Sequence, residues 1–368
     1  MGAGGFLFVH GTGDVFLRRT AMDLSAQTRS VLSGQELQAP EVVEVARALA
    51  EPGVSQASKE AFLEALARRG ETPGEIAAFA EAFRELARSP GLEPWAPVAI
   101  DVCGTGGDKS GSFNISTAVS FVLAAAGIPV IKHGNRSITS HCGSADILEA
   151  LGIRIDLEPA ALQAAMESLN FVFLFAPAYH PAFKEIGPVR RALGARGARS
   201  IFNVLGPLLN PARPAMQLMG IYADALVPTI ASALDRLGLA GGLVVHGTGP
   251  DGRVFDELTA TGPNRACGFG RLRAIDLSFT AADAGVEPAR VSDLAGGNAA
   301  ANAAILARLL AGEAPRGLVD TVALNAAAGL YVTGRYGSIR EAVPEARDLL
   351  VGGAVAEWLA RARTFFAR

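Results

Sequence analysis

The sequence predicts an α/β protein in which a small helical N-terminal domain precedes a larger α/β domain with a mostly parallel central sheet. The first observation is that residues 22–92 carry apolar side chains at helical spacing. The second is that short apolar runs alternate with helical segments from residue 93 onward. Strands separated by helices pair in parallel and lie under those helices. We therefore expect a helical domain over residues 22–92 and an α/β domain over residues 93–368.

The composition narrows the classes of function. Half of the 368 residues are hydrophobic and the formal net charge is −3, so no strong positive field favours nucleic acid or a membrane surface as a partner. No apolar stretch is long enough for a membrane span. Cys103, Cys142 and Cys267 lack metal-ligand spacing, which indicates reduced thiols in the cytoplasm. Any bound anion would be held locally, by backbone N–H groups and a few cations.

Residues 1–21 are expected to be an extension outside the fold. They are glycine-rich and weakly amphipathic, and they lack the long apolar core and cleavage site of a signal peptide. The HGTGD segment at residues 10–14 has no strand–loop–helix unit around it, so we interpret it as a chance match.

The helical domain is predicted to contain four helices. Pro52 and Gly53 end the second, Gly70 ends the third, and Thr72 with Pro73 begins the fourth. In the second domain the apolar runs predict strands over 98–103, 128–132, 171–177 and 242–247. Helices are expected over 116–126 and 144–151, and again through most of the chain from residue 296.

A glycine-rich loop, GTGGDKSGSFNIST at residues 104–117, lies between a predicted strand and a predicted helix. It is neither a P-loop nor a dinucleotide motif, because Lys109 occupies the third glycine position of GxGxxG. Asp108 would repel phosphate unless it faces a hydroxyl, an amine or magnesium. Glycine amides and the helix N-terminus favour anion binding, but a plain tight turn is an equal alternative for this loop alone. Side-chain donors are available at Ser112, Asn114, Ser116 and Thr117.

Two further loops shift the balance toward a binding site. Lys132, His133, Asn135 and Ser144 lie in KHGNRSITSHCGSAD after the second strand, where parallel α/β sheets bind ligands. A solvated loop is the alternative interpretation. The adjacent carboxylates Asp256 and Glu257 follow the strand over 242–247, and one or two carboxylates with phosphates and waters are the ligands that Mg²⁺ prefers.

Taken in order, these segments resemble the anthranilate phosphoribosyltransferases, which have the nucleoside phosphorylase/phosphoribosyltransferase type of fold. The resemblance covers the chain from about residue 22 to its end. It rests on GTGGD with FNIST, KHGNRS, GSADILEALG, FLFAPAYHPAF, IFNVLGPLLNPA, the DE pair and LNAAAGL.

The resemblance implies transfer of the phosphoribosyl group of phosphoribosyl pyrophosphate to the amine of anthranilate in tryptophan biosynthesis, with two Mg²⁺ ions. It implies that helices from about 178–210 join the N-terminal helices above the active-site cleft, and that the chain forms a homodimer. The expected donor-binding residues are Gly104, Thr105, Gly107, Asp108, Ser112, Asn114, Ser116, Thr117, Lys132 and Ser144. The expected acceptor-binding residues are Gly104, His133, Asn135 and Arg199, and the expected metal contacts are Ser116, Asp256 and Glu257.

Three departures from the family pattern bear on these expectations. His141 and Cys142 replace a basic residue and a hydroxyl before GSAD, and Ala301 stands where glutamate is common. LGARGARSIFN holds three additional residues, so Arg196 and Arg199 compete for one role.

The expected chemistry needs little covalent help. Magnesium, Lys132 and loop amides would stabilise the leaving pyrophosphate, and no strong general base is required, because the anthranilate amine is unprotonated at neutral pH. His133 would orient the acceptor or serve as a packing residue. The rival functions are a pyrimidine nucleoside phosphorylase of the same fold and a non-catalytic nucleic-acid-binding relative. The DE pair argues against both, and the negative net charge argues against the second.

Overall fold

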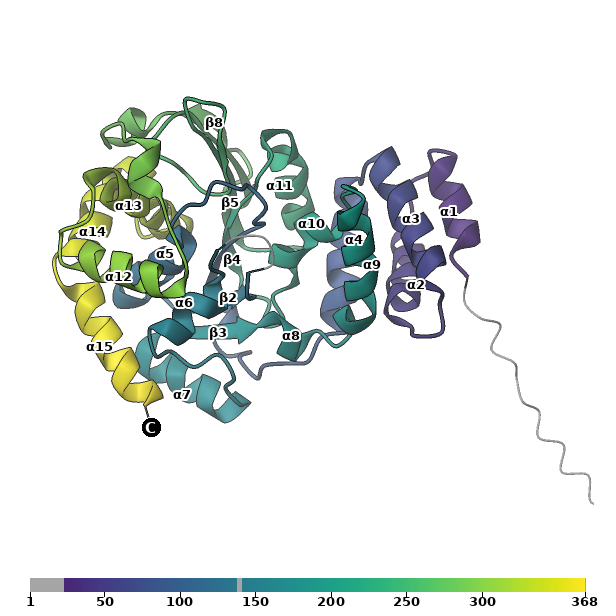
Figure 1. The fold of residues 1–368 in the computed structure, drawn as a ribbon, viewed down its shortest axis with the longest axis horizontal. Helices are drawn as coiled ribbons and strands as arrows, with labels where there is room; N and C mark the ends of the chain where they lie inside the picture. Colours follow the sequence, from purple (N-terminus) through teal and green to yellow (C-terminus); the bar gives the residue numbers. More distant parts are fainter. Residues whose placement is uncertain (1–22, 138–140, 368) are drawn as a thin grey trace, which may run out of the picture.

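The computed structural model describes residues 23–137 and 141–367. The chain forms a helical bundle and, beside it, a larger part built around a sheet (Figure 1). The predicted extension over residues 1–21 lies outside the described residues. Across the described ranges, no helix is both long and apolar enough to cross a membrane.

Four N-terminal helices form, and their ends follow the residues that the sequence marks. The Ser55 hydroxyl accepts a hydrogen bond from the Ser58 N–H at the start of the third helix. Gly70 ends that helix with a positive φ of 88°. Thr72 begins the fourth helix with a capping box. The helices are α1 (Ser25–Leu32), α2 (Ala39–Ala50), α3 (Gln56–Arg69) and α4 (Pro73–Glu85).

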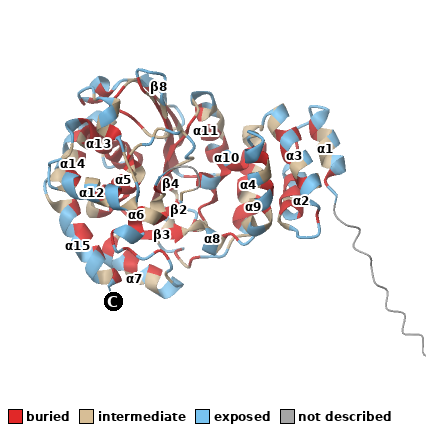
Figure 2. Cartoon of the chain, viewed as in Figure 1, coloured by how far each residue is buried: buried red, intermediate tan, exposed pale blue. Residues whose placement is uncertain are grey.

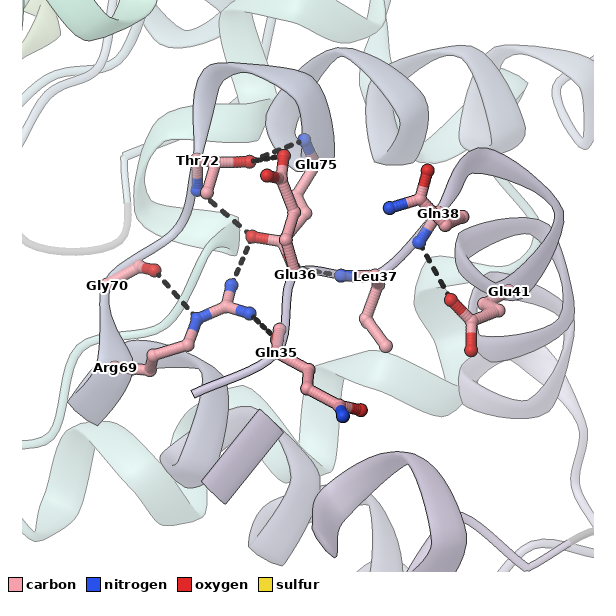
Figure 3. Close-up of polar contacts among 9 residues, drawn as sticks. All are labelled: Gln35, Glu36, Leu37, Gln38, Glu41, Arg69, Gly70, Thr72 and Glu75. Atoms are coloured by element: carbon pink, nitrogen blue, oxygen red, sulfur yellow. Dashed lines mark hydrogen bonds and ion pairs between the residues drawn. The ribbon is translucent and has the colours of Figure 1, made fainter. Parts of the chain in front are cut away.

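A buried carboxylate joins the ends of these helices (Figure 3). Glu75 in α4 accepts hydrogen bonds from the backbone N–H groups of Leu37 and Thr72, both at 3.0 Å, and pairs with Arg69 at the end of α3. Leu37 lies between α1 and α2, so one side chain connects three segments of the bundle. These partners offset the desolvation of the buried charge.

Two later helices return to the bundle. α9 (Phe183–Ala195) packs against α2 and α3, and α10 (Phe202–Leu205) packs against α4. The rings of Phe83, Phe183 and Phe202 meet with centroid separations of 5.5 to 5.6 Å. The predicted domain boundary between residues 92 and 93 stays a prediction.

The second part contains a mixed sheet with strand order β3-β2-β1-β4-β5-β7-β8, and β6 pairs with β5. The five strands from β3 to β5 in this order are mutually parallel, whereas β6, β7 and β8 are antiparallel to their neighbours. The predicted fold class is confirmed. The strands are β1 (Ile100–Gly104), β2 (Val130–Gly134), β3 (Phe171–Phe175), β4 (Met216–Gly220), β5 (Gly241–Thr248), β6 (Val254–Phe255), β7 (Asn264–Gly270) and β8 (Asp276–Phe279).

Several strand limits differ from the prediction. A 3₁₀ turn over Ala96–Val98 delays β1, and α8 (Ala176–Tyr179) begins where β3 was expected to continue. The sequence did not indicate β4, because Gln217 interrupts its apolar run, nor the short antiparallel strands β6 to β8.

Apolar side chains alternate between two cores, one on each face of the sheet. The strands of the sheet are largely buried (Figure 2). Leu243 and Val245 of β5 belong to the core under the C-terminal helices, whereas Val244 belongs to the core shared with α11 (Val227–Arg236) and the helical bundle. The bundle is therefore packed onto the sheet through α11. The helices on the first face are α5 (Ile115–Ala125), α6 (Ser144–Ala150), α7 (Pro159–Leu169), α12 (Ala299–Leu310), α13 (Arg316–Val332), α14 (Ile339–Val351) and α15 (Ala354–Phe366).

Candidate active site

The acidic pair lies against the carboxyl ends of two parallel strands. Asp256 follows β6, and its backbone passes the last residues of β1 and β4, Gly104 and Gly220. A Cβ atom on Gly220 would lie 1.4 Å from the Asp256 carbonyl oxygen, and one on Gly104 would lie 2.2 Å from Asp256 Oδ2. Only glycine at these two strand ends lets the acidic segment approach so closely.

The glycine loop after β1 contacts both carboxylates. The Gly106 N–H donates to Asp256 Oδ2 at 2.7 Å, and the Ser112 hydroxyl donates to Glu257 Oε1 at 3.2 Å. The structure therefore brings together three of the predicted site residues, Ser112, Asp256 and Glu257, although 144 or more positions separate the serine from the pair.

Burial and mutual repulsion raise the pKa values of these acids. Burial, together with the neighbouring Asp108 carboxylate, raises the pKa of Asp256 to about 7. Burial also raises the pKa of Glu257 well above its usual range, with contributions from Asp256 and Asp108. Asp108 Oδ2 is buried with no hydrogen-bond partner. A dication would relieve this repulsion, so the residues fit Mg²⁺, although the described residues hold no group of three His, Cys, Asp or Glu side chains arranged for a metal.

The glycine loop ends at the N-terminus of α5, as expected. Lys109, at the position that breaks the dinucleotide motif, adopts a left-handed conformation with φ of 57°. Ser116 and Thr117 lie in the first helical turn, where the positive end of the helix dipole favours anions, and the Thr117 N–H donates to the Asn114 carbonyl oxygen at 3.1 Å. Thr117 Oγ1 is buried without a hydrogen-bond partner. Together the turn and this hydroxyl offer donors to a ligand.

Lys132 connects β2 to this helix start. Its side chain is 1% exposed, and Nζ donates to the Val102 carbonyl oxygen and, at 3.2 Å, to Ser116 Oγ. Burial lowers the pKa of Lys132, and the charges of Asp101, Glu257 and Asp256 oppose that decrease. An ammonium group is thus held between the glycine loop and the second loop.

The Asn114 side chain bridges three segments of the chain. Its Nδ2 donates to the Cys142 carbonyl oxygen at 3.1 Å, and its Oδ1 accepts from Asn302 Nδ2 at 2.7 Å. It therefore joins the glycine loop to the second loop and to α12.

The second loop folds back on the end of β2. The Asn135 carbonyl oxygen accepts the Ala145 N–H at 3.3 Å, and Ser144 is the first residue of α6. A Cβ atom on Gly134 would lie 3.4 Å from Ser144 Cβ, so Ser144 stays close to the strand end. Residues 138–140 of this loop lie outside the described residues.

Two buried histidines meet below the second loop. The rings of His133 and His180 are 5.2 Å apart, and Nε2 of each is buried without a hydrogen-bond partner. Burial lowers the pKa of His133 to about 3 and that of His180 to about 4. The two rings are therefore uncharged at neutral pH and each keeps one ring nitrogen for a ligand.

The contacts continue from His180 to an arginine. The Phe183 ring lies 5.7 Å from His180 and 5.5 Å from Phe202, and the Arg190 guanidinium lies 5.9 Å from the centre of the Phe202 ring. Burial lowers the pKa of Arg190, and no carboxylate of the described residues forms an ion pair with it. A half-buried guanidinium without a counter-ion is costly unless a ligand supplies one.

The two arginines that competed in the sequence have different partners. Arg196 forms ion pairs with Glu60 and Glu64 of α3. Arg199 is exposed and lies over the Tyr222 ring at 4.3 Å. The Tyr222 N–H donates to Thr105 Oγ1 at 3.2 Å, so Arg199 is the one of the two connected to the glycine loop.

The sequence alone did not mark His180 or Arg190 as site residues. His180 stands inside FLFAPAYHPAF, a segment that supported the resemblance, and Arg190 lies 10 positions later, on α9. The sequence feature that could have indicated them is a histidine and an arginine on either side of aromatic residues. It does not distinguish Arg190 from Arg191, Arg196 or Arg199.

Comparisons with known proteins agree with this geometry. A family model described as "Glycosyl transferase family, a/b domain" matches residues 96–356, and one described as "Glycosyl transferase family, helical bundle domain" matches residues 28–87. The fold and the site together therefore define a glycosyl transferase.

Individual relatives narrow this class. The anthranilate phosphoribosyltransferases of Deinococcus radiodurans and Sorangium cellulosum are 42% and 44% identical to this chain, over 88% and 90% of its length and 93% and 92% of theirs. The crystal structure of the Thermus thermophilus enzyme superposes with a TM-score of 0.84 at 41% identity, covering 94% of this chain and 100% of that one. The chain belongs to the anthranilate phosphoribosyltransferase family.

The fold is also shared at lower identity. The Saccharomyces cerevisiae anthranilate phosphoribosyltransferase, solved in complex with PRPP and Mg, superposes with a TM-score of 0.80 at 22% identity and covers 94% of this chain and 98% of that one.

Proposed function

We propose that this chain transfers the phosphoribosyl group of phosphoribosyl pyrophosphate to the amine of anthranilate, giving N-(5-phosphoribosyl)anthranilate and pyrophosphate in tryptophan biosynthesis. The observation that carries the proposal is the contact between the acidic pair and the glycine loop, beside the buried ammonium of Lys132. A polyphosphate with a divalent cation is the ligand that satisfies both the carboxylates and the amides.

The donor would bind along the glycine loop and the start of α5. Gly107, Ser116 and Thr117 would present N–H and hydroxyl donors to its phosphates, while Lys132 would face the pyrophosphate that leaves. Asp256, Glu257 and Ser116 would hold Mg²⁺, with two ions expected. When bound, Mg²⁺ neutralises the charge that develops on the leaving pyrophosphate. The remaining donor contacts are proposed at Gly104, Thr105, Asp108, Ser112, Asn114 and Ser144.

The acceptor would bind beside the two histidines. Because His133 and His180 are uncharged at neutral pH, their free ring nitrogens can hydrogen bond to anthranilate without removing a proton from it. Gly104 and Asn135 would complete the acceptor side. Positioning, rather than general base catalysis, is then the main contribution of the protein.

An arginine would bind the anthranilate carboxylate bidentately. Arg199 and Arg190 are the two candidates, and burial distinguishes them. Arg190 is half-buried, and no ion pair with it forms among the described residues; the rings of Phe202 and Phe183 separate it from His180. Arg199 is exposed over Tyr222. We favour Arg190 for the carboxylate and leave Arg199 a role at the glycine loop.

A fluorescence assay tests the proposal. Anthranilate fluorescence should fall only when phosphoribosyl pyrophosphate and Mg²⁺ are both present, with stoichiometric release of pyrophosphate. Ribose 5-phosphate in place of the donor is the control. Turnover of a pyrimidine nucleoside with inorganic phosphate, and none with anthranilate, would instead identify a nucleoside phosphorylase.

A cytoplasmic homodimer is proposed for the working enzyme. Cys103 and Cys267 are free thiols, which suits a reducing compartment, and the family resemblance assigns dimer contacts to the helical domain. Sedimentation at micromolar concentration would give twice the mass of the chain if the dimer forms.

A further inference from the structure

Strands β1 and β2, which lead to the two ligand loops, separate sooner than their neighbours. β1 pairs with β4 along its whole length, from Ile100 opposite Met216 to Gly104 opposite Gly220. It pairs with β2 only at Ile100 opposite Val130. If the parallel ladder continued from there, the Ile131 carbonyl oxygen would accept a hydrogen bond from β1. The Val102 carbonyl oxygen would accept one from the His133 N–H.

Side chains occupy those three backbone groups instead. The Asn210 amide donates to the Ile131 carbonyl oxygen at 2.8 Å, and Lys132 Nζ donates to the Val102 carbonyl oxygen. The His133 N–H donates to Asp101 Oδ1 at 3.3 Å. These three buried groups are thus satisfied by side chains, and at this position the ladder is replaced by a wedge of three side chains.

The wedge is a connected network in the interior. Asn210 Nδ2 also donates to Asp101 Oδ2 at 3.0 Å, so one carboxylate holds both the His133 backbone and the asparagine. Asp101 is 0% exposed and Asn210 is 1% exposed. Burial raises the pKa of Asp101 to about 6, and the charge of Lys132 opposes the increase. Burying this carboxylate costs free energy that ordinary backbone pairing of β1 with β2 would not cost.

The network also reaches the helical bundle. Asn210 directly follows a 3₁₀ turn over Gly206–Leu209, and within that turn the Leu208 carbonyl oxygen accepts from Arg84 Nε of α4 at 2.7 Å. The segment that completes the wedge is therefore held by the bundle on its other side.

We propose that Asp101 and Asn210 are positioning residues, which hold β1 and β2 apart so that Lys132 and His133 are aimed at the donor and the acceptor. The inference rests on the roles proposed above for Lys132 and His133. Asp101 makes no contact with substrate in this scheme. It acts through its hydrogen bond to the His133 backbone and through its charge beside Lys132.

The test is a double-mutant cycle on kinetics. Asp101→Asn keeps the size of the side chain but turns an amide toward the Asn210 amide. We expect kcat to fall roughly tenfold or more while the KM for the donor changes much less. The reason is that the orientation of Lys132 and His133 affects the transition state more than the bound ground state. Asn210→Ala should have the same pattern and replaces the first variant if that one does not fold.

The exchange variant Asp101→Asn with Asn210→Asp restores a donor–acceptor pair at this position. It should recover at least about threefold of the lost kcat/KM, since residues in one hydrogen-bond network couple. The cycle includes Asn210→Asp alone, and the inference would be overturned if the effects of Asp101→Asn and Asn210→Asp simply multiply in the exchange variant.

Matched variants separate positioning from folding and from the proposed roles. Asp320→Asn alters another buried aspartate, which pairs with Arg347 on α14, and should lower the melting temperature without changing kcat or either KM. Lys132→Ala and His133→Ala report on the roles themselves, and wild-type activity in both would contradict those roles and the inference with them. Loss of activity in both, together with wild-type kcat and KM in Asp101→Asn and in Asn210→Ala, would overturn the wedge alone.

Discussion

The Gly106 N–H donates a 2.7 Å hydrogen bond to Asp256 Oδ2, which joins the glycine loop after β1 to the acidic segment after β6. The two residues are 150 positions apart in the chain. The contact exists because β1 and β4 are adjacent parallel strands that both end in glycine, so that the acidic segment can cross their carboxyl ends.

Removing either acid should weaken the complex of metal and donor without unfolding the protein. Asp256→Asn or Glu257→Gln leaves one carboxylate for Mg²⁺, and we expect kcat/KM to fall by several factors of ten, each worth about 1.4 kcal/mol. Added Mg²⁺ should recover part of the loss. Metal titration of the double variant in the presence of donor measures the effect, and unchanged affinity and turnover would show that the pair does not bind the metal.

Gly220→Ala should displace the acidic segment. The new Cβ would lie 1.4 Å from the Asp256 carbonyl oxygen, so the backbone must move and the donor KM should rise while the melting temperature falls. Gly194→Ala is the matched control: this helical residue has no atom within 4 Å of the added Cβ, and the change should stabilise α9 by roughly 0.5–1 kcal/mol. Normal kinetics in Gly220→Ala would contradict the close approach.

Three arginine variants should separate the acceptor site from the bundle surface. Arg190→Ala is expected to raise the KM for anthranilate far more than the KM for the donor, because the carboxylate loses its bidentate partner. Arg196→Ala should leave both values unchanged, since its partners are Glu60 and Glu64. If Arg199→Ala alone has the anthranilate effect, the carboxylate lies at the glycine loop and the assignment to Arg190 is wrong.

The buried histidines should make the protein less stable in mild acid. The folded-state pKa of His180 is about 4, below the ordinary value of about 6.5, so as the pH falls the unfolded chain binds a proton that the folded chain refuses. Its contribution is fully present above the unfolded pKa and decreases below it, by about 2 kcal/mol from about pH 7 to about pH 5.

Denaturant titrations across this range test that contribution. His180→Phe keeps a ring of similar shape and should show a smaller decrease in unfolding free energy than the wild type. An equal decrease in both proteins would contradict the neutral buried state of His180.

Much of the fold followed from local patterns. Apolar spacing, Gly70 and the Thr72–Pro73 start predicted the four N-terminal helices, because capping and helix periodicity act over a few residues. The alternation of apolar strands with helices predicted the parallel part of the sheet in the same way. The antiparallel strand β7 was not predicted, because its seven residues include two glycines and an arginine, and only pairing with β5 makes them a strand.

The candidate site was likewise predictable only in part. Glycine, lysine and acidic residues in the right order indicated which segments bind and what chemistry suits them, since those properties belong to the residues themselves. Which side chains meet depended on long-range packing. His180 lies beside His133 because β2 and β3 are paired. Arg196 forms ion pairs with two glutamates on α3 instead of facing the glycine loop. Burial, which sets the pKa values of His133, Asp256 and Arg190, arises only when separate elements pack together, and no local pattern in the chain encodes it.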